Sequence, residues 1–221
     1  MKNATFVCTT LLLLGVWLST GAQEKSDCKC HCNQATAVKQ TPYTHTALVV
    51  VGHGAPASDF PREKFQTLLR LERQIEQAGG EEKAPDTLVN HYRQIELECR
   101  LHPRTPQNDP YNAAVERIAR AIAQTNRFDR VLIAHNEFCG LDVDEAIEQA
   151  IKQGATRVIV VTTMLVGGVH SERDIPQKIA RAQAKFPKVQ IQYIWPISPQ
   201  SIANLMLQEI ERHTGTPTAS Q

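Results

Sequence analysis

The sequence predicts an α/β fold built on a four-stranded parallel sheet that is flanked by helices. Two features support this prediction. Continuous apolar runs, such as ALVVV at 47–51 and VIVV at 158–161, are typical of parallel strands that are covered on both faces. Segments with helical periodicity separate these runs, and this alternation implies right-handed strand–helix–strand crossovers.

The same patterns place the remaining elements. Two further strands are expected at 130–135 and 189–195. Asp86, Asp142 and Ser198 each precede a helical pattern, and their side chains are suited to cap it by accepting a backbone N–H. The spacing of Val115, Ile118 and Ile122 predicts one helix, and Ile202, Leu205, Met206 and Ile210 of the last helix are expected to face inward.

A helical region at about 59–109 separates the first two strands. Its two helices are amphipathic, the first through Phe65, Leu68, Leu69 and Ile75 and the second through Leu88, Tyr92, Ile95 and Cys99. We therefore expect a helical insertion after the first strand, within one domain at 47–213.

Composition excludes some classes of protein. The chain has 221 residues, 42% of them hydrophobic, with formal net charge +1. This length suits one globular domain with a sizeable core, and no basic excess points to nucleic acid.

The first 22 residues are predicted to be a secretory signal peptide. Lys2 precedes a largely apolar run at 6–18, and small residues follow it up to Ala22. The run is short for a membrane span, and no cysteine follows the small residues directly to accept a lipid. We expect an exported protein of the bacterial periplasm, with an uncleaved amino-terminal anchor as the alternative.

A cysteine cluster lies in the polar tail and linker expected at 23–46. Cys28, Cys30, His31 and Cys32 form the sequence CKCHC with Lys29, a dense set of soft metal ligands. Two interpretations are equally good. The cluster is a tail that collects metal, or its cysteines form disulfides or have no role there. A second polar tail is expected at 214–221, and it is predicted to fray.

Three ionisable side chains follow the carboxyl ends of predicted strands. His53 follows the first strand, Glu137 the second and His170 the third. Ligand crevices of open α/β sheets lie at these ends, so the three side chains should converge. Two imidazoles and a carboxylate suit a divalent ion such as cobalt, nickel, iron or zinc. His135 also lies at this edge, but its place inside an apolar run predicts a packed histidine.

Three motifs together resemble the class II tetrapyrrole chelatases, and most of all the small sirohydrochlorin cobaltochelatases of the CbiX type. They are VVVGHGAP at 49–56, NEF at 136–138 before an acidic helix, and VTTMLVGGVHSERDIP at 161–176. The resemblance covers about 47–213 except for the insertion. It implies a single chelatase-like domain.

The resemblance also implies a reaction, the insertion of a divalent metal into sirohydrochlorin or a related tetrapyrrole. His53 and His170 would hold the metal and accept protons, with Glu137 as an acidic partner in metal binding or proton uptake. Gly54, Gly167 and Gly168 would let the flat ring approach the backbone. The metal is a substrate, Co²⁺ in the first place and Ni²⁺ or Fe²⁺ as alternatives, and no organic cofactor is implied. The small members of the family pair as homodimers, so a homodimer is expected here.

Some residues of this sequence differ from the family pattern at positions that could contact the substrate. Ala55 and Pro56 stand where the family has a serine and a following arginine, so a hydroxyl and a cation that could meet substrate carboxylates are absent there. The arginines of the insertion offer replacements, although ordinary solvated charge is the favoured interpretation for them. They are Arg62, Arg70, Arg73, Arg93 and Arg100.

A second function is compatible with the same residues. An exported carrier of metal or tetrapyrrole would keep the fold and the histidines without turnover, and CKCHC would then collect the metal. A histidine phosphatase built on His53 is rejected, because Gly52 precedes the histidine and no arginine beside it holds phosphate.

Overall fold

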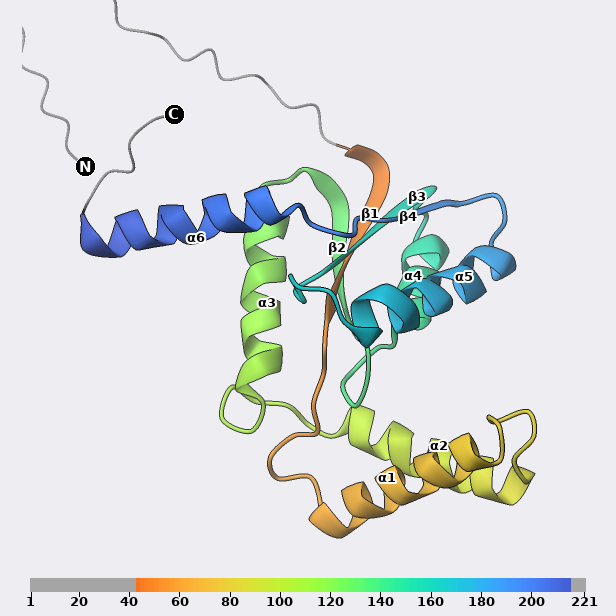
Figure 1. Cartoon of the computed structure of the whole chain (residues 1–221). Coiled ribbons are helices and arrows are strands. Elements are labelled where there is room, and N and C mark those ends of the chain that lie inside the picture. Colours follow the sequence, from red (N-terminus) through yellow and green to blue (C-terminus); the bar gives the residue numbers. More distant parts are fainter. Residues whose placement is uncertain (1–42, 216–221) are drawn as a thin grey trace, which may run out of the picture. The chain divides into compact units, whose positions relative to one another are not determined.

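The computed structural model describes residues 43–215. It contains a four-stranded sheet in the order β2-β1-β3-β4, with every neighbouring pair parallel (Figure 1). The strands are β1 (Tyr43–Gly52), β2 (Phe128–His135), β3 (Arg157–Thr162) and β4 (Gln190–Tyr193). The predicted four-stranded parallel sheet is confirmed. The expected signal peptide, the CKCHC tail and most of the carboxy-terminal tail lie outside the described residues.

The strands differ in length from their predictions, most of all β1 and β4. β1 begins at Tyr43, before the apolar run, because Tyr43 pairs with Phe128 of β2 and the two rings stack with centroids 5.2 Å apart. The polar stretch before Ala47 is therefore partly strand. β4 is shorter than expected and ends at Tyr193.

Two helices cover one face of the sheet. They are α4 (Val143–Lys152) and α5 (Ile175–Lys185), and their apolar residues form a buried cluster with alternate residues of β1 and β3. Asp142 caps α4 as predicted, in a capping box completed by Glu145. Gly154 follows that helix with φ of +96°, a conformation that glycine adopts without strain.

One helix, α3 (Pro110–Ala123), packs against the other face over β2 and β1. Val115 and Ala119 are buried against Leu48 and Val50. Ile118 of the same helix does not join them, since it is 46% exposed. Only one stripe of a helix can meet the sheet, and Val115 and Ala119 occupy it.

The helical insertion after β1 is confirmed as a pair of packed helices, α1 (Arg62–Gln77) and α2 (Asp86–Leu101) (Figure 1). Leu68, Leu71, Ile95 and Cys99 are buried between them and Phe60. Asp86 was expected to cap α2 and does not, because the helix begins one residue earlier than that role requires. Pro85 occupies the cap position, and no side chain caps the helix.

The last helix, α6 (Pro199–Thr214), begins at the expected place, with Ser198 accepting the backbone N–H of Ser201. Its apolar face was expected to turn inward, and this prediction is wrong. No residue of α6 is buried, and Leu205, Met206, Leu207 and Ile210 are 45–59% exposed. In Figure 1 the helix extends away from the sheet.

Residues 43–215 include no helix that combines the length and the apolar character needed to cross a bilayer.

Candidate metal centre

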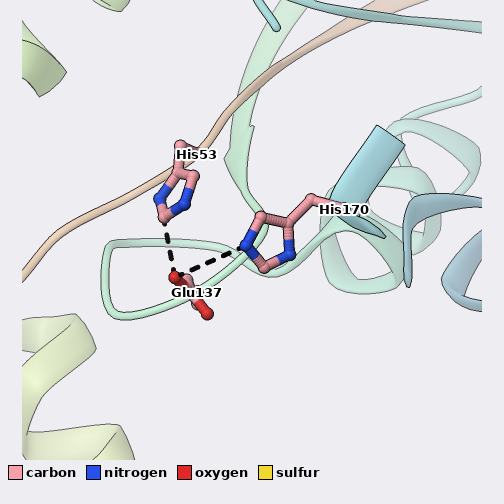
Figure 2. A group of neighbouring side chains, drawn as sticks. All are labelled: His53, Glu137 and His170. Atoms are coloured by element: carbon pink, nitrogen blue, oxygen red, sulfur yellow. Dashed lines mark ion pairs between the residues drawn. The ribbon is translucent and has the colours of Figure 1, made fainter. Parts of the chain in front are cut away.

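Three side chains, each from a different segment that follows a strand, meet at the carboxyl edge of the sheet, as the sequence predicted. His53 follows β1, Glu137 follows β2, and His170 begins η1 (His170–Asp174), a single π-helical turn after β3 (Figure 2). One potential ligand atom from each lies within 4.8 Å of the other two. Nδ1 of His53 is 3.5 Å and Nε2 of His170 is 4.0 Å from Oε1 of Glu137. This is the spacing of donors that could share one metal ion, and both chemistry and geometry fit a divalent cation.

Backbone pairing continues past the ends of β1 and β2 and sets His53 beside Glu137. The backbone N–H of Glu137 donates to the carbonyl of His53 over 3.1 Å. Gly54 follows with φ of +93°, and a Cβ at this position would lie 1.8 Å from the carbonyl oxygen of Glu137. Only glycine therefore permits this contact between the two loops, because any side chain would force them apart.

The orientation of the His53 ring has local causes. Its Nδ1 lies 2.6 Å from the carbonyl oxygen of Gly54 and thus faces both this oxygen and Oε1 of Glu137. The backbone N–H of His53 donates to the Tyr111 hydroxyl over 2.9 Å. The rings of His53 and His170 meet edge to face with centroids 4.7 Å apart.

Asp174 orients His170 and was missed by sequence reasoning. Its Oδ2 lies 2.7 Å from Nδ1 of His170, four residues earlier on the same helical turn. Burial opposes ionisation of Asp174, but hydrogen bonds from Arg173 and His170 outweigh it and lower the pKa of Asp174. The carboxylate therefore holds the proton on Nδ1 and leaves Nε2 free toward Glu137. The signal for this role was the spacing in HSERD, which places residues 170 and 174 on one helix face.

Asn136 also contacts His170. Its amide nitrogen lies 2.8 Å from Nδ1, while its Oδ1 is buried without a partner. An amide turned so that Oδ1 faces Nδ1–H would remove both the donor–donor contact and the orphaned oxygen. In either orientation Asn136 packs against the side of the ring away from Nε2.

A buried arginine ties together the loops that carry His53 and Glu137. Arg104 donates from Nη1 to the carbonyl of Ala55 over 2.6 Å and to Asp109, and from Nη2 to the carbonyl oxygens of Cys99 and Phe138. Its side chain is 11% exposed and that of Asp109 is 3% exposed. Asp109 in turn caps α3. Arg104 lies in the proline-rich segment before α3 and was not singled out by its sequence context.

A cavity of about 260 Å³ adjoins Glu137 and lies between the insertion and α5. Glu72, Tyr92, Glu96 and Asp174 are among the residues that line it. Burial raises the pKa of Glu72, and the negative charges of Glu137 and Glu76 add to this effect. Burial also raises the pKa of Glu96, although Arg100 opposes the shift. The insertion thus places carboxyl groups with raised pKa values, which take up protons more readily, beside the candidate metal centre.

A larger hollow between α2 and α4 contains none of the three candidate ligands.

His135 is packed, as predicted, and does not join the cluster. It is 3% exposed, and burial lowers its pKa to about 4, so it is neutral near pH 7. Cys99 and Cys139 are free and buried, and burial raises the pKa of each thiol to about 11. Thiols with such a pKa are poor metal ligands and poor nucleophiles.

The remaining candidate residues have varied surroundings. Gly168 has open space where a Cβ would project, whereas a Cβ at Gly167 would lie 2.3 Å from Oε1 of Glu172. Among the arginines of the insertion, Arg93 pairs with Glu81 and Arg100 with Glu145, so these two are engaged within the protein. Cys28, Cys30, His31 and Cys32 lie outside the described residues, and their expected metal binding stays a prediction.

Comparisons with known proteins give matches that agree with one another. The CbiX family model matches residues 107–213. Sirohydrochlorin cobaltochelatases of Methanopyrus kandleri and Methanocaldococcus jannaschii are 35% and 39% identical over 71 and 61 residues. These matches cover 32% and 28% of this chain, and 50% and 43% of the relatives.

A relative that handles a different metal also matches. The sirohydrochlorin ferrochelatase of Bacillus subtilis is 38% identical over 55 residues, which are 25% of this chain and 21% of that protein. The chain therefore spans half or less of the length of these curated relatives.

Proposed function

We propose that this chain is a chelatase of the CbiX type, whose family model matches residues 107–213, and that it inserts a divalent metal ion into sirohydrochlorin or a related tetrapyrrole. The observation that carries the proposal is the meeting of His53, Glu137 and His170, whose donor atoms lie within 4.8 Å of one another. A chelatase must take an ion from water, present it to a ring and dispose of two protons. These three side chains are suited to each of those tasks.

We propose that the two imidazoles bind the incoming ion and that Glu137 completes the set. The neutral rings offer borderline-soft nitrogen donors, which suit cobalt, nickel and iron better than they suit magnesium or calcium. Co²⁺ is the metal that we expect, since two of the matching relatives are named for it, with Fe²⁺ and Ni²⁺ as alternatives. Three protein ligands leave the remaining coordination positions for water and then for the ring nitrogens.

The proposed binding place of the ring is the open edge above these side chains. His53, Glu137 and His170 are 44%, 28% and 31% exposed, so a flat ligand has access to the ion from solvent. Val166 and Val169 are 80% and 56% exposed in the loop that leads to His170 and offer apolar contacts to a macrocycle. Gly168, between them, leaves space for close approach. The neighbouring 260 Å³ cavity is smaller than the roughly 300–1,000 Å³ of sites that enclose drug-sized ligands, so we place the ring outside it.

Glu137 has a second proposed role as acceptor of the protons that leave the ring. It lies between the candidate metal centre and the cavity that Glu72 and Glu96 line. Since burial raises the pKa of Glu72 and Glu96, these carboxyl groups are able to take up a proton near the centre more readily than exposed carboxyls. Protons would pass from the ring to Glu137 and then to this cavity.

Export to the periplasm, metal collection by Cys28, Cys30, His31 and Cys32, and pairing of two copies are also proposals. A non-catalytic carrier is the alternative to a chelatase, and it is not favoured, because the matching relatives are named for chelatase activity.

The test is anaerobic incubation of the protein with sirohydrochlorin and Co²⁺, Ni²⁺ or Fe²⁺, followed by the absorption spectrum of the tetrapyrrole. His53→Ala and His170→Ala should slow insertion to near the protein-free rate. His91→Ala, on the exposed surface of α2, should keep the wild-type rate. Insertion by the wild-type protein no faster than without protein would rule out the chelatase. Tight binding of metal or ring without turnover would favour the carrier.

A further inference from the structure

The arginines of the insertion divide into two groups. Two of them are engaged within the protein, Arg93 with Glu81 and Arg100 with Glu145. Three others lie on α1 with exposed side chains, and these form no ion pair or hydrogen bond with any residue of 43–215; they are Arg62, Arg70 and Arg73. The positive charge of α1 is therefore available to a ligand.

One side of α1 faces the candidate metal centre. The ring of Phe65 packs edge to face against that of Phe138, the residue after Glu137, with centroids 5.3 Å apart. Glu72 lines the cavity that adjoins Glu137. Phe65 and Glu72 are seven residues apart, so they lie on the same face of the helix. We call the face of Phe65 and Glu72 the centre-facing side of α1.

Arg62 and Arg73 border the centre-facing side. Each residue of a helix is turned by about 100° from the one before, so these two arginines lie close to one line along α1, roughly a quarter turn from Phe65 and Glu72. The side that packs against α2 lies in the opposite direction, and its buried residues are Leu68, Leu71 and Ile75. The two arginines are thus exposed next to the candidate metal centre and away from α2.

We propose that Arg62 and Arg73 bind carboxylate side chains at the rim of the tetrapyrrole, so that the insertion selects a carboxylate-rich ring. A guanidinium offers a carboxylate two parallel N–H donors and keeps its charge at every physiological pH. The inference rests on the proposed function. It assigns to the insertion the recognition of substrate carboxylates, for which Ala55 and Pro56 after His53 offer neither a hydroxyl nor a cation.

The charges around the centre make such cations important. Glu137 and Asp174 are carboxylates, and like charge would oppose the approach of a carboxylate-rich ring. Two neighbouring cations are already engaged, since Lys178 pairs with Asp142 and Arg173 with Asp174. Arg62 and Arg73 offer positive charge that is not neutralised by a partner within the described part of the chain.

The experiment measures the binding of two metal-free porphyrins to the full chain by absorption and fluorescence titration. Uroporphyrin carries carboxylates all around its rim, whereas mesoporphyrin carries far fewer on the same macrocycle. The double variant carries Arg62→Gln and Arg73→Gln.

The matched control is Arg70→Gln. Arg70 lies on the same helix but lines a hollow with Glu63 and His91, and this hollow contains none of the candidate metal ligands. All three arginines are exposed, so each variant should keep the native fold, as far-UV circular dichroism will check.

The double variant should bind uroporphyrin about 3- to 10-fold more weakly than the wild type does, since an exposed ion pair contributes up to roughly fivefold in affinity. Its affinity for mesoporphyrin should change little, and that for Co²⁺ should be unchanged. High salt should weaken wild-type binding of uroporphyrin and reduce the difference, because salt screens exposed charges. Arg62→Lys with Arg73→Lys should restore most of the affinity. In the insertion assay the double variant should raise KM for sirohydrochlorin and keep kcat.

Three results would overturn the inference. They are equal affinity of the wild type and the double variant for uroporphyrin, an equal loss in Arg70→Gln, and a wild type that binds neither porphyrin. The porphyrin titrations contain no metal. A protein that binds uroporphyrin through Arg62 and Arg73 but inserts no metal would therefore support this inference while the chelatase proposal fails. Metal insertion without any effect of the two arginines would do the reverse.

Discussion

Asp174 accepts a hydrogen bond from Nδ1 of His170 over 2.7 Å, one helical turn further along the chain. This contact decides which ring nitrogen is available for a metal. With the proton held on Nδ1, the lone pair of Nε2 faces Glu137. Carboxylates that hold a metal-binding histidine in this way also make it a stronger ligand. Asp174 thus acts on the candidate centre through His170 without reaching it.

Asp174→Asn should weaken binding of Co²⁺ about 10- to 100-fold, the usual cost of losing such an orienting partner. The neutral amide oxygen accepts from Nδ1–H more weakly than the carboxylate does, so the tautomer and the position of the ring are held less firmly. Titration of the protein with Co²⁺, followed by absorption in the visible range, measures the effect. Asp129→Asn is the matched control, because Asp129 is exposed at the opposite end of β2. An equal loss in both variants, or none in either, would contradict the role of Asp174.

Gly54→Ala should destabilise the protein and separate the loops of His53 and Glu137. A Cβ would lie 1.8 Å from the carbonyl oxygen of Glu137, and the residue would be held at φ of +93°. Strain of this kind costs on the order of 1–3 kcal/mol. Thermal melting measures the loss of stability and Co²⁺ titration measures the loss of affinity. Gly168→Ala is the control, since nothing lies within 4 Å of its added methyl. A melting temperature for Gly54→Ala equal to that of Gly168→Ala would show that the loops adapt.

Arg104→Lys should lower both stability and metal affinity. A lysine cannot donate at once to Ala55, Cys99, Phe138 and Asp109, which the guanidinium reaches with two nitrogens. Breaking a buried ion pair by removing one partner costs about 3–5 kcal/mol, and the lysine, which keeps the charge, should lose less. Urea unfolding and Co²⁺ titration give the two quantities.

The control for this change is Arg181→Lys, which alters an exposed pair with Asp144. Exposed pairs contribute about 0–1 kcal/mol, so this variant should resemble the wild type. If Arg104→Lys lost stability but bound Co²⁺ with unchanged affinity, Arg104 would support the fold without positioning the metal centre.

The place of the candidate centre could be predicted from the sequence because a parallel sheet brings the carboxyl ends of its strands to one edge. His53, Glu137 and His170 each come soon after an apolar run in the sequence. Because the run forms a strand, a residue that follows it lies at the carboxyl end of that strand. The start of α4 was equally predictable, since Asp142 and Glu145 form the capping pattern that begins a helix.

Contacts between distant segments could not be predicted in the same way. Arg104 lies 49 residues from Ala55 and 34 from Phe138 along the chain, and no local pattern indicates those partners. The apolar stripe of α6 was recognised, but periodicity shows only that a helix has an apolar face. What covers the face depends on where the chain leads after β4, and this is why the inward placement of Met206 and Ile210 was wrong.

Glu72→Gln should stabilise the metal-free protein at pH 7, and the gain should fade as the pH falls. Burial, with the charges of Glu137 and Glu76, raises the pKa of Glu72 in the folded state above its unfolded value. Above the folded pKa the ionised carboxylate therefore costs stability, and below the unfolded value of about 4.3 that cost is absent. Urea unfolding of both proteins at several pH values, with a chelator present, follows the difference. Glu82→Gln, at an exposed position before α2, should show no such pH-dependent gain. A Glu72→Gln protein that is less stable than the wild type at pH 7 would mean that the carboxylate is stabilised by contacts that outweigh its burial.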